Sequence, residues 1–224
     1  MLWLVYNRDM SAVPLRRVAL LVSALVMALV VTAGVLTMNT PHRSRSAALG
    51  QGIEGFGPEL ESTHCPVERG PVKAGSDADR NKVSATVLNT TVVSLRSKPK
   101  PSTYPNNNRI TSTEFHIWAL TAFATQYKSE ADGDIHLVIK DASGNSMIAE
   151  LPAPTCEPSS SRWQAAIDSA RATFVHTYPS STSWHYIHRL TDLRGVGFMD
   201  VLHGQAGVAP DGVELHPVLY IHFR

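Results

Sequence analysis

The chain has 224 residues, of which 43% are hydrophobic and 17% charged, with a formal net charge of +1 at pH 7. This composition excludes a disordered chain, and the length suggests one domain with accessory segments. Residues 1–48 hold five Lys or Arg residues and one acid, which leaves 15 basic and 18 acidic residues, near −3, in the rest. That balance argues against non-specific binding to nucleic acid, because such binding depends on contacts with phosphate.

The N-terminal segment carries the first predicted element. Arg16 and Arg17 precede 21 uncharged residues from Val18 to Met38, which is long enough for a helix to cross a bilayer. The preceding positive charges predict that residues 1–17 lie in the cytoplasm and the remainder of the chain outside it. The run is interpreted as a single-pass anchor in the cell membrane or as a signal peptide cleaved after Ala33, which would give a secreted protein. Its length favours the anchor.

A linker is predicted to follow the membrane segment. Residues 39–63 are rich in Gly, Ser, Pro and Thr and show no period, which indicates a flexible tether. The extracytoplasmic domain with its N-terminal arm is therefore expected to span residues 64–224. The start of translation stays open between Met1 and Met10.

Two cysteines, Cys65 and Cys156, lie after the uncharged run. In an oxidising compartment such a pair most often forms a disulfide, and the alternative is two unpaired buried thiols. Neither cysteine has the CxxC spacing of a redox or zinc site. A disulfide would close a loop of about 90 residues and stabilise the fold by a few kcal/mol. It would also attach the segment around Glu68 to the later part of the domain.

The first elements of the domain are predicted from periodicity and turn residues. Asp77 is placed to cap a short helical turn from Ala78 to Val83. Residues 113–127 alternate and contain aromatic side chains, which predicts a long strand. Residues 130–152 are interpreted as two strands joined by a hairpin turn at Gly144-Asn145.

A helix and two strands complete the predicted order. Residues 159–178 form the helix, with a serine as N-cap and one apolar face at 3.6-residue spacing. That face consists of Trp163, Ala166, Ile167, Ala170 and Phe174. Strands follow at residues 185–200 and 212–223, and Gly195 and Gly197 are predicted bulge positions in the first of them.

Three strands, a helix and two strands in this order are typical of an OB-fold barrel, in which the helix lies between the third and fourth strands. The sequence therefore predicts a mainly β (α+β) domain built as a small OB-like five-stranded barrel. Some other small α+β domains share this order, and periodicity does not show whether a barrel closes.

The end of the chain carries a family resemblance. Residues 195–219 read GVGFMDVLHGQAGVAPDGVELHPVL, and VERGPVKAGSDAD and DGDIHLVIKDASGNSMIAELPAPTC precede them. These stretches resemble an uncharacterised family of exported bacterial proteins with the ending GVGFFD…HGQ…APN-G-ELHPVL, and the match covers roughly residues 65–224. The chain has Phe198-Met199 where the family has two phenylalanines, and Asp211 where it often has asparagine. The resemblance implies export and no particular activity.

The same ending holds the candidate site. Glu214 and His216 share one face of the last predicted strand, while Asp200 and His203 lie at the end of the preceding strand and the start of its loop. Pairing of the two strands would bring these four groups together. Two imidazoles and two carboxylates suit a divalent metal, the one cofactor that the sequence indicates, or an acid–base pair. The opposite, core face is expected to consist of Val213, Leu215, Pro217, Leu219 and Ile221.

A structural role is the alternative for these four residues. Asp200 would accept backbone N–H groups, and His203 would donate to a loop carbonyl. Glu214 and His216 would then tie the hairpin together. The chain has no HExxH, GxSxG or GxGxxG motif that would specify a reaction.

Two other polar stretches are given structural interpretations. Residues 68–73, ERGPVK, predict an ion pair that locks the N-terminal arm, with a role in substrate binding as the minority interpretation. Asp132, Asp134 and His136 lie near a strand start. They are interpreted as part of a turn, because a calcium loop needs more oxygen ligands at set spacing.

Three functions stay open. The leading one is an exported or membrane-tethered binding module for an unknown protein, glycan or other envelope partner. Its site would surround the loop between the last two strands, since OB folds often bind through such loops. The second is a metal-dependent hydrolase, nuclease-like, that uses Asp200, His203, Glu214 and His216. The third is a structural envelope protein without a ligand. The sequence favours a binding protein over an enzyme, and fold analogy alone supports neither.

Overall fold

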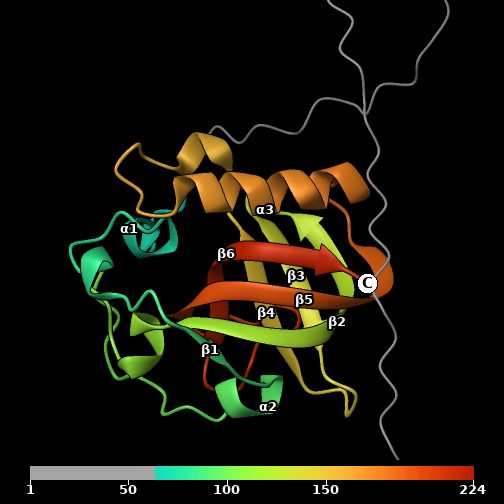
Figure 1. Cartoon of the computed structure of the whole chain (residues 1–224), viewed down its shortest axis with the longest axis horizontal. Coiled ribbons are helices and arrows are strands. Elements are labelled where there is room, and N and C mark those ends of the chain that lie inside the picture. The colour runs from blue at the N-terminus through green and yellow to red at the C-terminus, as the bar shows by residue number, and fades with distance from the viewer. Residues whose placement is uncertain (1–63) are drawn as a thin grey trace, which may run out of the picture. The chain divides into compact units, whose positions relative to one another are not determined.

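The computed structural model describes residues 64–224, which form a mainly β domain with few helices (Figure 1). The predicted cytoplasmic segment, membrane run and linker, residues 1–63, lie outside the described residues. Within residues 64–224, no helix combines the length and the apolar character needed to cross a membrane.

Six strands of the described part form one sheet in the order β1-β2-β3-β4-β6-β5, and β5 also pairs with β2. The strands are β1 (Val87–Asn89), β2 (Ile117–Ser129), β3 (Ile135–Lys140), β4 (Ser146–Leu151), β5 (His185–Met199) and β6 (Val213–Phe223). The pairings therefore lead from β2 through β3, β4, β6 and β5 back to β2. β1 is parallel to β2 and β4 is parallel to β6, while the other pairs are antiparallel.

One long helix accompanies the sheet. The α-helices are α1 (Gly70–Lys73), α2 (Val92–Leu95) and α3 (Gln164–Thr177), and short 3₁₀ helices span Arg80–Lys82, Ser112–Phe115 and Pro154–Cys156. Figure 1 shows α3 along one side of the strands, with α1 near one end of it and α2 on the opposite side of the sheet. α3 follows β4 in the chain and precedes β5, as predicted.

The apolar face of α3 is confirmed, whereas the serine N-cap is wrong. Ile167, Ala170 and Phe174 are at most 3% exposed. The helix begins at Gln164 without a side-chain cap. Ser161 instead donates from its Oγ to the carbonyl oxygen of Ala74 at 2.6 Å, so this serine joins the N-terminal arm to the start of α3.

The sequence did not reveal β1. Two of its three residues are exposed and it pairs only with β2, so it shows neither the length nor the alternation by which a strand is recognised. The observed sheet therefore has one strand more than the five predicted. The predicted strands at residues 113–127, 130–152, 185–200 and 212–223 correspond to β2, the β3–β4 hairpin, β5 and β6.

The glycine bulges in β5 change the register with β6. Gly195 pairs with Val218 and Gly197 pairs with Leu215, with register shifts on both sides of Gly195, so the predicted bulges are confirmed. The shifts interrupt the alternation of β6, put Val218 into the core and leave Leu219 only half-buried. The core face predicted for β6 is therefore wrong at Leu219, because strict alternation does not survive a bulge.

Gly197 lies against the 3₁₀ helix Ser112–Phe115, where a Cβ atom would overlap the carbonyl oxygen of Thr113 and come within 2.9 Å of Trp118 Nε1. We expect Gly197→Ala to lower the free energy of unfolding by about 1–3 kcal/mol, measured by urea denaturation. Gly70→Ala is the matched control, since a Cβ there meets no atom within 4 Å. Equal stability of the two variants would contradict this packing.

Candidate functional site

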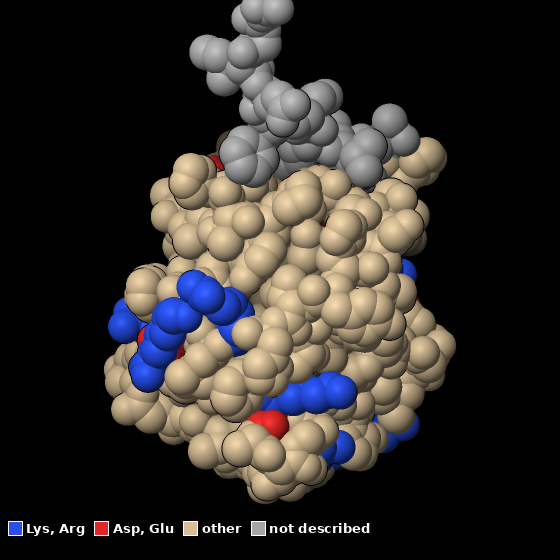
Figure 2. Space-filling view, turned by 90° about the vertical axis from the view of Figure 1, so that its right-hand side faces the viewer, with Lys and Arg blue, Asp and Glu red and all other residues tan. Residues whose placement is uncertain are grey.

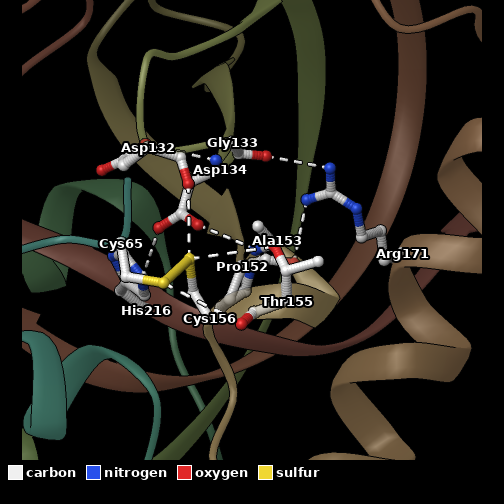
Figure 3. Close-up of a disulfide and its surroundings, with 10 residues drawn as sticks. All are labelled: Cys65, Asp132, Gly133, Asp134, Pro152, Ala153, Thr155, Cys156, Arg171 and His216. Carbon is white, nitrogen blue, oxygen red and sulfur yellow. Dashed lines mark hydrogen bonds and ion pairs between the residues drawn. A yellow bond between two sulfur atoms is a disulfide. The ribbon is translucent and has the colours of Figure 1, made fainter. Parts of the chain in front are cut away.

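A disulfide attaches the N-terminal arm, residues 65–82, to the segment that follows β4 (Figure 3). Cys65 and Cys156 form the bond, with their Cα atoms 5.2 Å apart, so the predicted disulfide is confirmed. The bonded residues are 91 positions apart in the sequence. For a loop of this size the chain-entropy model gives a stabilisation of about 4–5 kcal/mol.

Arg69 forms the predicted ion pair of the arm. The side chain is 1% exposed, and its Nη1 and Nη2 donate to the two carboxylate oxygens of Glu114 at 2.6 and 3.0 Å. The guanidinium also donates to the carbonyl oxygens of Pro105, Asn108 and Met199. These contacts fix the arm beside the end of β5.

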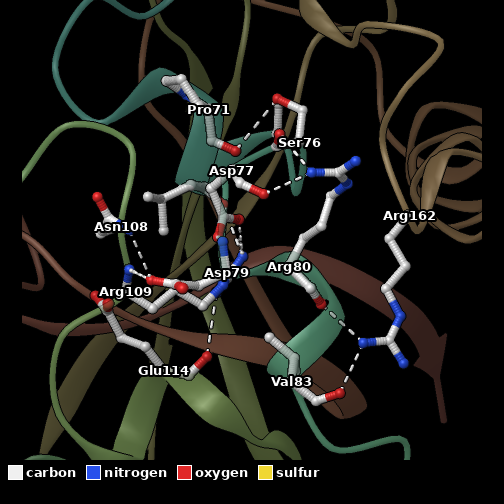
Figure 4. Close-up of polar contacts among 12 residues, drawn as sticks. Pro71, Ser76, Asp77, Asp79, Arg80, Val83, Asn108, Arg109, Glu114 and Arg162 are labelled. Atoms are coloured by element: carbon white, nitrogen blue, oxygen red, sulfur yellow. Dashed lines mark hydrogen bonds and ion pairs between the residues drawn. The ribbon is translucent and has the colours of Figure 1, made fainter.

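A second buried pair holds the next part of the arm (Figure 4). Arg109 Nη2 lies 2.7 Å from Asp77 Oδ2, and both side chains are 0% exposed. The capping role expected of Asp77 is confirmed, because its other oxygen accepts from the backbone N–H of Asp79 and its carbonyl oxygen accepts from the backbone N–H of Arg80. The predicted extent of the turn is wrong, since the short 3₁₀ helix spans only Arg80–Lys82.

Polar side chains gather in one buried cluster beneath the arm. They come from β3, β4, β6 and α1 and from residues that flank β2, β3 and β5. The members of this polar cluster are Lys73, Glu130, Asp134, His136, Glu150, Asp200, Glu214 and His216. All except Lys73 and Glu130 are at most 5% exposed, so the cluster holds charge where solvation is weak.

Glu150 of β4 lies at the centre of the polar cluster. Its Oε1 is 3.2 Å from Nδ1 of His136, the residue opposite it on β3, and its Oε2 is 3.1 Å from Nδ1 of His216. On the other side of the His216 ring, Asp134 Oδ2 lies 3.4 Å from Nε2. A fourth carboxylate oxygen, Oε2 of Glu214, lies 4.0 Å from His216 Nδ1. Each imidazole thus has carboxylate oxygens close to a ring nitrogen.

These contacts are not hydrogen bonds. Both ring nitrogens of His216, Nδ1 of His136 and Oδ2 of Asp134 are buried without a hydrogen-bond partner in the described part of the chain. The carboxylate oxygens therefore flank the ring nitrogens and do not lie on their N–H axes. A metal ion placed on such an axis would replace the proton of the ring nitrogen. The observed nitrogen–oxygen distances suit this, because two ligands that each lie about 2.1 Å from one tetrahedral ion are roughly 3.4 Å apart.

Backbone groups orient two of these side chains. His136 donates from Nε2 to the carbonyl oxygen of Ala206 at 2.8 Å, which turns Nδ1 toward the cluster. Asp134 accepts the backbone N–H of Ala153 on Oδ1 at 2.8 Å, which leaves Oδ2 facing His216 (Figure 3). Hydrogen bonds of this kind fix the tautomer and direction of residues that ligate metals.

The charges of the cluster act on one another. Burial disfavours the imidazolium form of His136, but the carboxylates of Glu130 and Glu150 outweigh it and raise the pKa to about 10. Burial has the same effect on His216, where Asp134, Glu150 and Glu214 hold the pKa well above its ordinary value. Without a metal ion, both imidazoles therefore hold protons at neutral pH.

A cavity of about 370 Å³ opens between the arm and the segment after β4. Its ionisable lining groups are Lys73, Asp134 and Glu157, beside the two bonded cysteines. Burial disfavours the ammonium form of Lys73, but carboxylates led by Glu150 outweigh this and raise its pKa. The cavity therefore has a fixed positive charge, and Asp134 connects it to His216 behind (Figure 3).

The raised pKa of Glu157 predicts that the stability of the fold depends on pH. Burial, together with the charges of Asp168 and Asp134, raises its pKa from 4.5 to about 8. The folded state then keeps a proton that the unfolded state loses, so stability falls as pH rises from about 4.5 to about 8. We expect Glu157→Gln to remove this loss of stability. Above pH 8 its free energy of unfolding should exceed that of the wild type by a few kcal/mol, measured by denaturation at several pH values. If the difference in free energy of unfolding between the two proteins does not change with pH, the raised pKa of Glu157 is contradicted.

Three of the four residues predicted to form a site lie in the polar cluster: Asp200, Glu214 and His216. His203 lies at the surface with its side chain 62% exposed, and its Nε2 is 3.6 Å from Asp200 Oδ2. Asp200 also accepts a hydrogen bond from Gln205 at 2.8 Å. Two sets in the described part have ligand atoms within 4.8 Å of one another, and among the four only His216 belongs to either.

The sequence interpretation missed Glu150 and took Asp134 and His136 for part of a turn. Glu150 stands alone in the apolar stretch MIAEL, and His136 precedes the apolar stretch LVI. A lone ionisable group on an apolar strand was the available signal, because such a group needs a buried partner. The partner itself is set by the register of the β3–β4 hairpin, in which His136 lies opposite Glu150; the sequence predicts the hairpin but not this register.

Unlike the buried polar cluster, one face of the molecular surface is mainly uncharged. The face in Figure 2 consists mainly of uncharged residues, with a few Lys and Arg side chains and fewer Asp and Glu side chains. This face offers no broad cationic area of the kind that contacts nucleic-acid phosphates.

Comparison of the chain with protein-family models, curated proteins and solved structures found no match. The resemblance of its C-terminal ending to exported bacterial proteins therefore stays a prediction.

Proposed function

We propose that the domain binds a divalent metal ion through Asp134, Glu150 and His216, and that this binding underlies its role as an exported binding module. The observation that carries the proposal is the His216 ring, whose buried nitrogens lack hydrogen-bond partners among residues 64–224 and face carboxylate oxygens at 3.1 and 3.4 Å. The ligand atoms of the three residues lie within 4.8 Å of one another. Imidazole and carboxylate together suit first-row ions such as Zn²⁺ and Mn²⁺.

We also propose an OB-like barrel as the architecture that holds this site. The return of the pairings from β5 to β2 and the position of α3 between β4 and β5 support it. The loop between β5 and β6 takes part through the carbonyl of Ala206, which orients His136.

Export with membrane attachment completes the proposal. The uncharged run from Val18 to Met38 supports it, and so does the Cys65–Cys156 disulfide, because disulfides persist in oxidising compartments. The membrane is then one partner of the protein.

Metal analysis of the full-length protein tests the metal site. After removal of metal with a chelator, reloading with Zn²⁺ or Mn²⁺ and desalting, we expect at least one ion per chain. His216→Ala and the isosteric Asp134→Asn should each reduce the bound metal. His203→Ala is the matched control and should retain it, because His203 is exposed and outside both ligand sets. A wild-type protein without stoichiometric metal would overturn the proposal.

Metal-dependent hydrolysis is the second candidate function, and the cavity favours it. Asp134 and Lys73 both line the cavity, so a bound substrate would meet a metal ligand and a fixed positive charge together. The ammonium group would attract an anionic substrate such as a phosphodiester. The test is hydrolysis of bis-(p-nitrophenyl) phosphate by the metal-loaded protein. Activity that disappears in Lys73→Met, with metal content unchanged, supports the candidate, and a rate equal to that of free metal excludes it for this substrate.

A further inference from the structure

The carboxylate of Glu150 faces two imidazoles, one with each oxygen. Oε1 is 3.2 Å from His136 Nδ1, and Oε2 is 3.1 Å from His216 Nδ1. The two rings come from β3 and β6, the strands on either side of β4 in the sheet. A carboxylate held between two such groups is placed to bridge two ions, one on each side.

His136 is oriented in the way that metal-ligating histidines are. Its Nε2 donates to the carbonyl oxygen of Ala206, and its buried Nδ1 has no hydrogen-bond partner in the part of the chain that the structure describes. Glu130 Oε1 lies 3.4 Å from that same Nδ1. The Trp184 ring packs perpendicular to the imidazole with the centroids 5.4 Å apart, which restrains the rotation of the imidazole. Glu130, His136 and Glu150 form the second set whose ligand atoms lie within 4.8 Å of one another.

The formal charge of the cluster agrees with a second ion at this place. Five carboxylates and the ammonium group of Lys73 have a formal charge of −4 when both imidazoles are neutral. The carboxylates are those of Glu130, Asp134, Glu150, Asp200 and Glu214. Metal binding requires neutral imidazoles and displaces their protons. Two divalent ions would balance this formal charge.

We propose that the polar cluster is a dinuclear metal centre, with one ion held by Asp134, Glu150 and His216, a second by Glu130, His136 and Glu150, and Glu150 as the bridging ligand. This inference rests on the proposed function and adds the second site. Two divalent ions held by one carboxylate are the arrangement used for hydrolysis of phosphate esters and amides. Glu130 is the outermost ligand, since its side chain is 31% exposed, so the second ion exchanges with solvent more readily.

Titration of the metal-free, full-length protein with Mn²⁺ tests the dinuclear centre. Isothermal calorimetry should give two ions per chain, and electron paramagnetic resonance should show the coupled signal of two Mn²⁺ ions that share a bridge. Glu130→Gln should reduce the stoichiometry to one ion and remove the coupling. This variant is expected to fold because the side chain is partly exposed. Glu68→Gln, at an exposed position of the arm, is the matched control and should bind two.

The outcomes separate the two proposals. One ion in the wild type, with an uncoupled signal, leaves the proposed function in place and overturns the dinuclear centre. Absence of binding overturns both. Two ions in Glu130→Gln would overturn the assignment of Glu130, and Glu150→Gln that keeps two coupled ions would overturn the bridge.

Discussion

Replacement of Glu114 by glutamine is expected to lower the free energy of unfolding by about 3–5 kcal/mol, because it leaves the buried charge of Arg69 without its carboxylate partner. The carboxylate accepts two bonds from Arg69 and the backbone N–H groups of Ile110 and Met199. It therefore joins the N-terminal arm, the loop before β2 and the end of β5. Urea denaturation followed by circular dichroism measures the effect.

An exposed pair provides the control for this prediction. Arg224 contacts both oxygens of Asp192 at 2.7 and 2.8 Å, and its side chain is 53% exposed. Because solvent screens such a pair, Asp192→Asn should change the stability by at most about 1 kcal/mol. A Glu114→Gln variant as stable as Asp192→Asn would show that the arm does not depend on the buried pair.

The second large effect expected is stabilisation by metal. An ion that binds only the folded state adds about 4 kcal/mol when its free concentration is a thousand times its dissociation constant. Addition of Mn²⁺ or Zn²⁺ to the chelator-treated protein should therefore raise the unfolding temperature by several degrees. Differential scanning calorimetry with and without chelator measures this shift.

Two variants assign the stabilisation to the polar cluster. Asp134→Asn keeps the shape of the side chain and should lose most of the shift, because Oδ2 would no longer be a charged ligand. His203→Ala should keep it, since His203 is a surface residue. An equal shift in both variants would place the bound metal elsewhere on the protein.

Local patterns in the sequence were sufficient for most of the fold. The alternation of β2, the turn residues at Gly144-Asn145 and the apolar face of α3 each predicted the element that is present. β1 was missed because it has only three residues and stays largely exposed. The face of β6 was predicted wrongly at Leu219, because the register shifts around Gly195 interrupt an alternation that the sequence alone leaves intact.

The candidate site was predictable only around the last hairpin, from Asp200 to His216. Glu214 and His216 are two residues apart on one strand, and the imidazole beside the carboxylate drew attention to both. Glu150 and His136 meet through the pairing of β3 with β4, and strand register is not readable from residue types. Lys73 lies on the N-terminal arm, and the position of the arm depends on the buried contacts of Arg69. Local sequence patterns therefore do not predict that Lys73 joins the polar cluster.

The most direct test of the metal centre is anomalous diffraction from crystals of the full-length protein equilibrated with Mn²⁺, recorded above and below the manganese edge. The geometry of the polar cluster predicts a peak within bonding distance of Glu150 and His216, and a second peak near His136 and Glu130. Density confined to surface carboxylates, with the interior of the polar cluster empty of anomalous signal at saturating Mn²⁺, would contradict it.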